Sequence, residues 1–146
     1  MEWKIKSFEE LTTRELYEIL RSRAEVFVKE QGISYVDEDG VDYCSFHVFG
    51  LENDRVVAYL RAYKDDKSAD TVKIGRVLTL QHGRGIGTEL MGYAMEKLPE
   101  KTGCRKIIMD AQKHAVTFYE RLGFKVTSDE YLEEGVVHVD MEYDWE

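Results

Sequence analysis

The chain has 146 residues, of which 43% are hydrophobic and 12% aromatic, and its formal net charge is −9. This length and composition predict one folded domain, spanning residues 1–146, with a sizeable buried core. The acidic balance argues against nucleic acid as a partner, because phosphate binding needs a basic surface. No stretch has the length and apolar character of a membrane span or a secretion signal, so we expect a cytoplasmic protein with no membrane partner.

Acidic residues and cysteines bear on the ligands of the chain. Eight acidic residues and no Lys or Arg occupy positions 129–146. Such a run can attract a cationic substrate such as an amine, or it can be a solvated surface that aids solubility, and both interpretations stay open. Cys44 and Cys104 have no spacing typical of a metal or redox site, so no metal ion is expected. Both are expected to be small apolar residues of the core.

The first half of the chain predicts a strand, a helix and a hairpin. Residues 2–8 form the strand, and residues 12–31 form the helix, which Thr12 or Thr13 caps. Residues 32–42 make an irregular acidic loop, which is typical of a binding element in a small domain. Residues 44–51 and 56–63 predict the two strands of the hairpin. The buried face of the helix is expected to hold Leu16, Ile19, Leu20, Ala24, Phe27 and Val28.

Residues 72–80 predict the next antiparallel strand, and one charged side chain interrupts its apolar face. The even-numbered positions of this segment are apolar except for Arg76. Either a β-bulge redirects the Arg76 side chain, or the guanidinium is buried with an acidic partner. The acidic loop supplies Asp39 and Asp42, and we favour pairing with them.

A glycine-rich turn joins this strand to a second helix, predicted over residues 85–98 and ending near Pro99. Gly83, Gly85 and Gly87 stand at alternate positions. Glycine permits positive φ angles and close approach of other groups, and the first turn of a helix has unpaired N–H groups. Together these features predict a cradle for an anion, typically a phosphate. The alternative is a tight turn whose glycines serve only its geometry.

Two well-known phosphate-binding motifs do not fit the turn. The dinucleotide fingerprint requires a third glycine where Thr88 stands, which argues against a nicotinamide-dependent oxidoreductase. The Gly-Lys-Ser/Thr of a P-loop is also absent.

The remaining elements complete an α/β fold. Residues 104–110 predict a strand parallel to residues 72–80, because a helix connects the two. Residues 113–122 predict a helix that Gly123 ends, and residues 124–127 and 136–143 close the sheet. The predicted fold class is therefore α/β, with a mixed, mostly antiparallel twisted sheet flanked by helices. An exposed edge strand near the C-terminus could pair in a homodimer.

The element order and two local motifs resemble the GCN5-related N-acetyltransferase (GNAT) family, which implies the acyl-CoA N-acyltransferase fold. The first motif is the strand, the Gly-Arg-Gly-Ile-Gly turn and the helix. The second covers residues 112–124, with an alanine, an aromatic-tyrosine pair and Gly-Phe in the family's order. The resemblance covers nearly the whole chain. It is narrower to the ElaA-like branch at Phe27, Glu30, Gln31, Tyr35, Asp39, Asp42, His47, residues 75–77, Ala111, Gln112 and residues 135–138.

The resemblance implies acetyl-CoA as the acetyl donor. Its pyrophosphate would bind the N–H groups of residues 83–88, and its pantetheine arm would pair with the strand backbone. An N–H group of Leu78 or Thr79 would hold the oxyanion. Gln112 stands where the family usually has an Asn, and His82 stands where it usually has an Arg or Gln. The implied cofactor-binding residues are Leu78, Thr79, Leu80, His82, Gly83, Arg84, Gly85, Ile86, Gly87, Thr88, Gln112 and Tyr119.

The resemblance also implies direct attack by a primary amine, of a small molecule or a peptide, through a tetrahedral intermediate. Tyr119 matches the tyrosine proposed to protonate the leaving thiolate. A general base is needed because a lysine-like amine has a reference pKa of about 10.4. The candidates for this base are Glu30, Asp39, Asp42, His47, His114 and His138.

The predicted catalytic residues are Tyr119, Leu78, Glu30 and His138. The strand pattern around His47 is typical of a packed, hydrogen-bonded histidine. His138 shares a polar face with the acidic side chains of Asp140 and Glu142, a pattern typical of solvated residues. The alternative function is a regulatory module that binds acyl-CoA without turnover.

Overall fold

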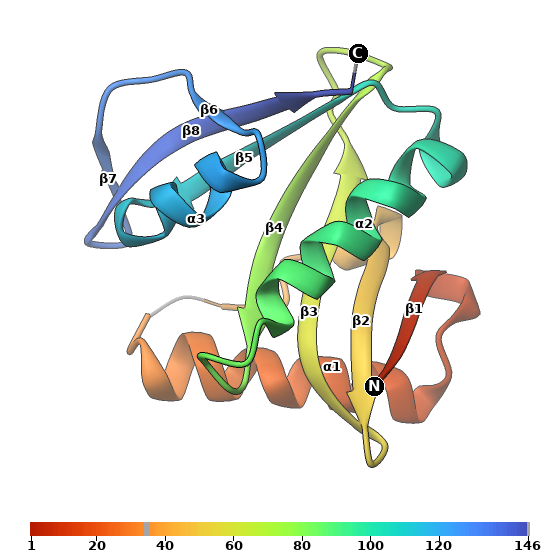
Figure 1. Cartoon of the computed structure of the whole chain (residues 1–146). Helices are drawn as coiled ribbons and strands as arrows, with labels where there is room; N and C mark the ends of the chain where they lie inside the picture. Colours follow the sequence, from red (N-terminus) through yellow and green to blue (C-terminus); the bar gives the residue numbers. More distant parts are fainter. Residues whose placement is uncertain (34–35, 146) are drawn as a thin grey trace.

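A twisted sheet runs through the centre of the molecule, with helices on both of its faces (Figure 1). The computed structural model describes residues 1–33 and 36–145; Tyr35, a position of the ElaA-like resemblance, lies outside them. The described strands are β1 (Glu2–Ser7), β2 (Phe46–Glu52), β3 (Arg55–Lys64), β4 (Thr71–Thr79), β5 (Lys106–Gln112), β6 (Lys125–Val126), β7 (Tyr131–Glu133) and β8 (Val136–Asp144). Their order in the sheet is β1-β2-β3-β4-β5-β8-β6, and β7 pairs with β8.

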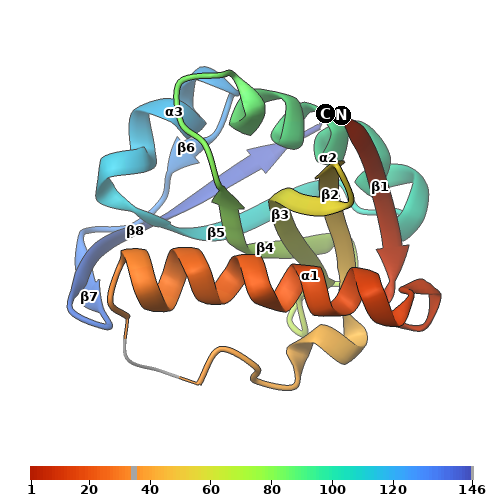
Figure 2. The same cartoon turned by 90° about the horizontal axis from the view of Figure 1, so that it is seen from below.

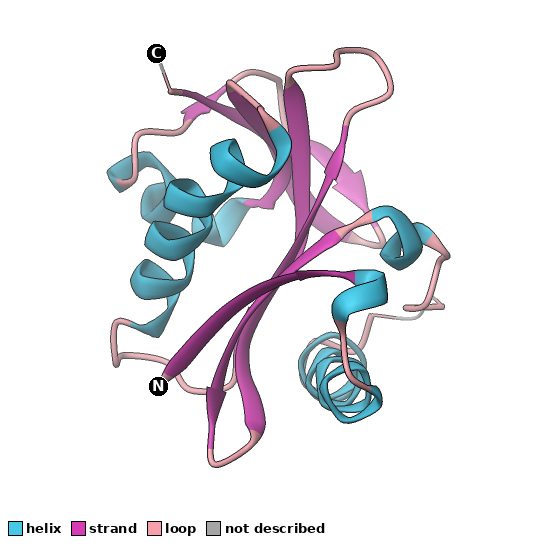
Figure 3. Cartoon of the chain, turned by 90° about the vertical axis from the view of Figure 1, so that its right-hand side faces the viewer, coloured by secondary structure: helices cyan, strands magenta, loops and turns pink. Residues whose placement is uncertain are grey.

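Helices cover the two faces of the sheet. α1 (Thr13–Arg23) and its π-helical continuation η2 (Ala24–Glu30) lie on one face, and α2 (Ile86–Thr102) and α3 (Val116–Arg121) lie on the other (Figure 3). Short 3₁₀ turns are η1 (Phe8–Glu10), η3 (Val41–Cys44) and η4 (Lys113–Ala115). Within the described part of the chain β4 and β5 are parallel and the other strand pairs are antiparallel. The predicted fold class is confirmed.

α1 begins as the sequence predicts and then changes its hydrogen-bonding period. The Thr12 hydroxyl accepts from the Glu15 N–H at 3.0 Å, and the Glu15 carboxylate accepts from the Thr12 N–H at 2.9 Å. These two bonds form a capping box. In η2 the bonds reach back five residues, which rotates the buried stripe. Val26 is therefore buried, whereas Ala24 and Val28 are exposed, so their predicted burial is wrong.

At Arg76 both alternatives from the sequence occur together. The β3–β4 register shifts opposite this residue, and Arg76 has a φ of +53°, so a bulge redirects its side chain. Its guanidinium pairs with Asp37 (Nε–Oδ1 2.8 Å) and Asp39 (Nη2–Oδ2 3.4 Å). The favoured partner Asp42 pairs instead with Arg23 and Arg61.

β4 and β5 pair over only part of their length. The parallel register runs from Thr71 opposite Lys106 to Ile74 opposite Met109. Beyond this point the two strands diverge, which opens the sheet on the side of β4 that faces away from β3 (Figure 1). The described pairing therefore leaves the last residues of β4 with a free backbone edge.

α2 extends past Pro99 to Thr102, so the predicted end of this helix is wrong. Proline has no N–H group, which deprives the Met95 carbonyl of its helical donor. The indole Nε1–H of Trp145 donates to that carbonyl at 3.1 Å. Gly103, with a φ of +72°, then ends the helix.

The C-terminal strand β8 is not an edge strand. β6 and β7 cover its outer side, and the sequence had not predicted β7. Glu134 and Gly135, with φ angles of +51° and +76°, form the two-residue turn between β7 and β8. The sheet edge near the C-terminus thus consists of two very short strands. Such strands offer few backbone hydrogen bonds to the strand of a second copy, as the predicted homodimer would require.

Apolar side chains pack on both faces of the sheet. The cluster that contains Leu90 and Leu98 fills the α2 face, and the cluster that contains Ile19 and Phe49 fills the α1 face. Cys104 belongs to the first cluster, as predicted. Cys44 is exposed at the end of η3, so the prediction of an apolar core residue is wrong there.

Candidate active site

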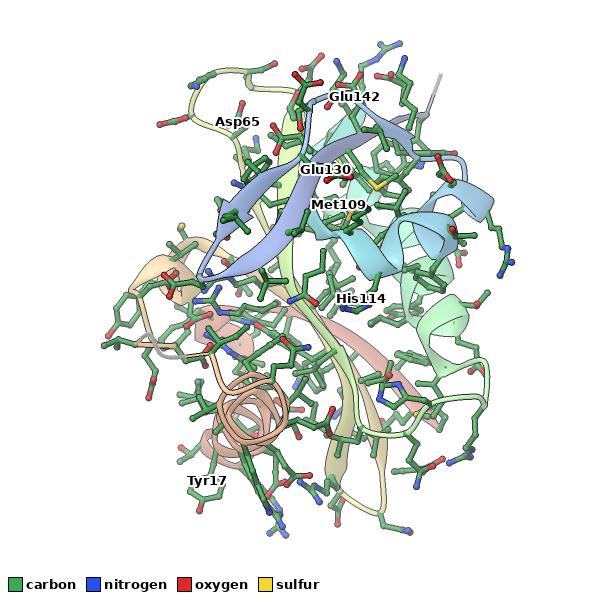
Figure 4. The ribbon with its side chains drawn as sticks, turned by 90° about the vertical axis from the view of Figure 1, so that its left-hand side faces the viewer. Tyr17, Asp65, Met109, His114, Glu130 and Glu142 are labelled. Carbon is green, nitrogen blue, oxygen red and sulfur yellow. The ribbon has the colours of Figure 1, made fainter. Side chains whose placement is uncertain are left out.

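A cavity of about 710 Å³ lies where β4 and β5 diverge. The glycine turn and α3 wall one end, and the end of η2 and the β7–β8 turn wall the other. In Figure 4, His114 lies between these ends, with α1 seen end-on below and the β7–β8 hairpin above. The volume is typical of pockets that hold a small molecule or cofactor.

Most of the residues predicted from the sequence line this cavity. Of the predicted cofactor residues, Leu80 and Arg84 are outside its described wall. The Leu80 N–H donates to the Val57 carbonyl at 2.8 Å, and the Arg84 guanidinium contacts Gln81 and Glu52. The predicted residues in the wall are Leu78, Thr79, His82, Gly83, Gly85, Ile86, Gly87, Thr88, Gln112, Tyr119, Glu30 and His138.

The glycine turn leaves the N-terminus of α2 open. Gly83 and Gly85 have φ angles of +80° and +74°, which favour glycine. Gly85 is the N-cap residue and has no side chain to cap the helix. The first helical bond runs from the Glu89 N–H to the Gly85 carbonyl at 3.1 Å. The N–H groups of residues 86–88 therefore have no helical acceptor, and the helix dipole favours an anion beside them.

The free edge of β4 adds further N–H groups to the cavity. Leu80 donates to β3, and N–H groups of a strand alternate between its two sides. The Leu78 N–H, opposite Tyr59, therefore points to β3, whereas the N–H groups of Val77 and Thr79 point to the open edge. Of the two N–H groups proposed for the oxyanion, this register favours Thr79.

The amide of Gln112 already has two protein partners. Its Nε2 donates to Gln31 Oε1 at 3.2 Å, and its Oε1 accepts from His114 Nε2 at 2.6 Å. The contact to Gln31 joins the end of β5 to the end of η2, which the sequence did not predict. An interaction of Gln112 with a cofactor would have to compete with these bonds.

Tyr119 is buried in the wall of the cavity, with only 6% of its surface exposed. Among the described residues its hydroxyl has no hydrogen-bond partner. Burial raises the pKa of the phenol to about 12. Tyr119 is therefore protonated throughout the neutral range, and its hydroxyl can donate a hydrogen bond into the cavity.

His138 lines the same cavity and is 7% exposed, so the interpretation of a solvated side chain is wrong. Its Nδ1 lies 2.8 Å from the Val136 carbonyl oxygen. A carbonyl can only accept, so Nδ1 carries the hydrogen and Nε2 of the neutral ring keeps a lone pair. Tyr131 stacks on the ring at 6.0 Å between centroids and donates its own hydroxyl to Asp140 at 2.6 Å.

His47 is a packed histidine, as its strand pattern predicts. Its Nε2–H donates to the Asp42 carbonyl at 3.0 Å, and its Nδ1 accepts from the Tyr59 hydroxyl at 2.7 Å. Burial lowers the pKa of His47, which keeps the ring neutral. With both nitrogens engaged, His47 has no lone pair for a substrate.

Two further candidate bases are held by arginines. The Arg61 guanidinium, 2.8 Å from Asp39 (Nη2–Oδ2), lowers the pKa of that carboxyl. Burial alone would raise the pKa of Asp42, but ion pairs with Arg23 (2.7 Å) and Arg61 (3.1 Å) lower it. Both aspartates belong to one ion-pair network, the Arg–Asp network, which consists of Arg23, Arg61, Arg76, Asp37, Asp39 and Asp42.

His114 and Glu30 complete the set of candidates. His114 is exposed and donates to Gln112, whereas Glu30 is exposed at the end of η2 and lines the cavity. In residues 1–33 and 36–145, no group of His, Cys, Asp and Glu side chains is arranged to hold a metal ion. The helices of this described part are all too short or too polar to span a bilayer.

Comparison with known proteins bears out the resemblance. Residues 22–145 match the family model described as "Acetyltransferase (GNAT) domain". Protein ElaA of Escherichia coli (strain K12) is 35% identical over 145 residues, which cover 97% of this chain and 95% of that protein.

Solved structures agree with the sequence comparison. The crystal structure of Escherichia coli ElaA has a TM-score of 0.90 and 34% identity, and it covers 98% of this chain and 99% of its own. An acyl-CoA N-acyltransferase from Pseudomonas aeruginosa has the same TM-score and coverage at 32% identity. An aminoglycoside 6′-N-acetyltransferase complexed with coenzyme A, at 16% identity and a TM-score of 0.72 over 97% of this chain and 96% of its own, shares the fold alone.

Proposed function

The chain belongs to the GNAT acetyltransferase family, and from this premise we propose that it transfers the acetyl group of acetyl-CoA to a primary amine of a small molecule or peptide. The family and its acyl-CoA N-acyltransferase relatives support acyl transfer in general. The acetyl group and the amine acceptor are the specific content of the proposal.

One observation carries the proposal: two unpaired sets of backbone N–H groups meet in one cavity. The open N-terminus of α2, at residues 86–88, suits the pyrophosphate of acetyl-CoA. The free edge of β4, at Val77 and Thr79, suits the amides of the pantetheine arm, which would add to the sheet as a strand does. A ligand with a phosphate and an extended amide chain fits both.

His138 is the general base of the proposed reaction. The Val136 carbonyl holds the hydrogen on Nδ1, which leaves the Nε2 lone pair available to the cavity. A protonated amine must lose a proton before it can attack a thioester carbonyl, and Nε2 can accept that proton. Glu30 is the second candidate, since it lines the cavity, but its exposure allows water to solvate its charge.

Tyr119 is the general acid. Its phenol is buried, protonated and without a partner among the described residues. As the new N–C bond forms and the C–S bond breaks, Tyr119 gives its proton to the thiolate. His138 returns its proton to the phenol through solvent, and the attacking nitrogen releases its second proton to solvent, so the ammonium ion and the thioester give an amide, a thiol and one free proton.

Amine-dependent loss of the thioester tests this proposal. The reaction is followed through the ultraviolet absorbance of the thioester, because a thiol reagent would also react with exposed Cys44. Loss that depends on both protein and amine supports the transferase. Separately, acetyl-CoA but not NAD should raise the melting temperature, since a ligand of the folded state stabilises it by mass action.

The two measurements separate the transferase from the alternative function. A rise in melting temperature without thioester loss for any amine would indicate a regulatory module that binds acyl-CoA. Absence of both effects would mean that the glycine turn serves only the geometry of the chain.

A further inference from the structure

Three carboxylates gather at the end of the cavity that lies opposite the glycine turn. Glu30 stands at the end of η2, and Glu133 and Glu134 stand at the β7–β8 turn. Figure 2 shows the end of η2, which continues α1, near β7, with the turn that precedes α2 at the top of the view. None of the three carboxylates forms an ion pair with another described residue.

The other charges of the cavity wall are balanced. Lys73 pairs with Asp110 at 3.1 Å. Arg61 and Arg76 belong to the Arg–Asp network, in which three arginines face three aspartates. The unbalanced charge of the described wall is therefore that of the three glutamates.

Two buried polar groups distinguish this cavity from an acidic surface: His138 lies in β8 beside the β7–β8 turn, and Tyr119 lies in α3 toward the glycine-turn end. His138 and Tyr119 are 7% and 6% exposed, line the cavity, and each keeps a polar atom without a partner among the described residues. Among the described residues the enclosed side-chain atoms that lack a partner are Arg55 Nε and Arg61 Nε, so the free atoms of His138 and Tyr119, two residues of the cavity wall, are not enclosed. A ligand that extends from the acidic end toward Tyr119 can thus hydrogen-bond to polar atoms for which the described residues supply no partner.

Glu134 occupies a turn position that its side chain does not favour. Its φ is +51°, and two-residue hairpin turns of this kind prefer Asn, Asp or Gly there. The chain therefore keeps a carboxylate at the mouth of the cavity despite the local backbone strain.

From these features we propose that the acceptor is a small primary amine with a second positive charge, as in a diamine. The reacting amine lies between His138 and Tyr119, and the second cation interacts with the three glutamates. This proposal rests on the proposed function and names the substrate class of the same site. The same chemistry is present in a free diamine and in a lysine-rich peptide, and we commit to the free diamine because the acceptor must share the cavity of about 710 Å³ with the reacting end of acetyl-CoA.

Three amines of matched length test the proposal. Butylamine has no charge at its far end, 1,4-diaminobutane has a positive one, and 4-aminobutanoate has a negative one. We expect kcat/KM for the diamine to exceed that for butylamine about tenfold, after allowance for its two equivalent amines, because each exposed ion pair contributes a few-fold. Butylamine should exceed 4-aminobutanoate. A lysine dipeptide amide that reacts better than the diamine would overturn the choice of a small acceptor.

Salt and side-chain charge identify the cause of the preference. Raising the ionic strength from about 0.01 M to about 1 M shortens the Debye length from about 30 Å to about 3 Å, so the preference should shrink. The triple variant Glu30→Gln, Glu133→Gln, Glu134→Gln should lose it. The matched control Glu96→Gln, Glu100→Gln, Glu120→Gln removes the same charge from exposed positions outside the cavity and should keep it.

Glu134→Asn distinguishes a binding role from a structural one. Asn suits the positive φ, so this variant should unfold at an equal or higher temperature while KM for the diamine rises two- to threefold. A variant that loses both stability and affinity would point to a structural carboxylate instead.

The outcomes of this test differ from those that would reject the transferase itself. Equal kcat/KM for the diamine and butylamine, with turnover present, overturns the dication proposal and leaves the transferase intact. If no amine reacts, calorimetric titration of the three probes into protein loaded with CoA decides the matter. Tighter binding of the diamine then supports the acidic subsite, and equal binding overturns it.

Discussion

His138 Nδ1 lies 2.8 Å from the carbonyl oxygen of Val136, two residues earlier on the same strand. This contact determines which ring nitrogen carries the hydrogen, and so leaves Nε2 as the acceptor of a side chain that lines the cavity. A backbone carbonyl thereby orients the proposed base, with no charged partner in the described part of the chain.

Replacement of this base should slow the chemical step and spare donor binding. His138→Gln is expected to lower kcat with butylamine by 10²- to 10⁴-fold, the usual contribution of a general base. The rise in melting temperature caused by acetyl-CoA should be unchanged. Glu30→Gln serves as the comparison, since we expect it to change kcat with butylamine less than threefold. A larger loss for Glu30→Gln than for His138→Gln would transfer the role of base to Glu30.

Tyr119→Phe should lower turnover far more than acetyl-CoA affinity. The loss is expected to be about 10- to 100-fold in kcat, because a thiolate with a pKa near 8.5 needs only modest help to leave. Removing the hydroxyl breaks no hydrogen bond among the described residues, so the free energy of unfolding should not fall. Urea denaturation checks this, and unchanged turnover would remove Tyr119 from the mechanism.

Several features of the site and of the helix ends were predictable because they depend on local sequence. Gly83 and Gly85 adopt the positive φ that the turn requires, and Thr12 and Glu15 form the capping box that their spacing favours. Such features are determined within a few residues of the chain, so a single sequence reveals them.

The features that the sequence did not reveal depend on contacts between distant segments. α2 passes Pro99 because Trp145, far along the chain, donates to the Met95 carbonyl. Asp37 pairs with Arg76 through an irregular loop whose path no periodic pattern encodes. The choice between Leu78 and Thr79 needed the strand register, which the β3–β4 pairing and the bond from Leu80 to β3 supply.

The bulge in β4 can be tested through its arginine. Arg76→Gly keeps the positive φ but removes the ion pairs to Asp37 and Asp39, whereas Arg76→Ala also strains the backbone. Both variants should be less stable than the wild type, and the alanine variant should be the worse by about 1 kcal/mol. Chemical denaturation measures the difference. Equal stability of the two variants would show that the backbone conformation relaxes once the side chain is removed.

Glu15 should make stability depend on pH in the acid range. Burial alone would raise its pKa, but the Thr12 N–H and the ammonium groups of Lys4 and Lys6 lower it to about 2, from 4.5. Because the folded-state pKa is the lower one, the stabilisation is complete above pH 4.5 and is lost as the pH falls toward 2.

Glu15→Gln should therefore reduce the free energy of unfolding by on the order of 2 kcal/mol at pH 7. The difference from wild type should narrow as the pH falls below 4.5. Glu9→Gln, an exposed neighbour, should show no such pH-dependent difference. A Glu15→Gln deficit that is the same at pH 7 and pH 3 would assign the effect to packing rather than to charge.

The central claim is that the cavity between β4 and β5 joins acetyl-CoA to an amine. The most direct measurement is mass spectrometry of a reaction that contains the protein, acetyl-CoA and 1,4-diaminobutane. We predict acetylated diamine and free CoA in equal amounts, both greatly reduced with His138→Gln. Acetyl-CoA that stabilises the protein but yields no acetylated amine, with this or any other amine, would contradict the account.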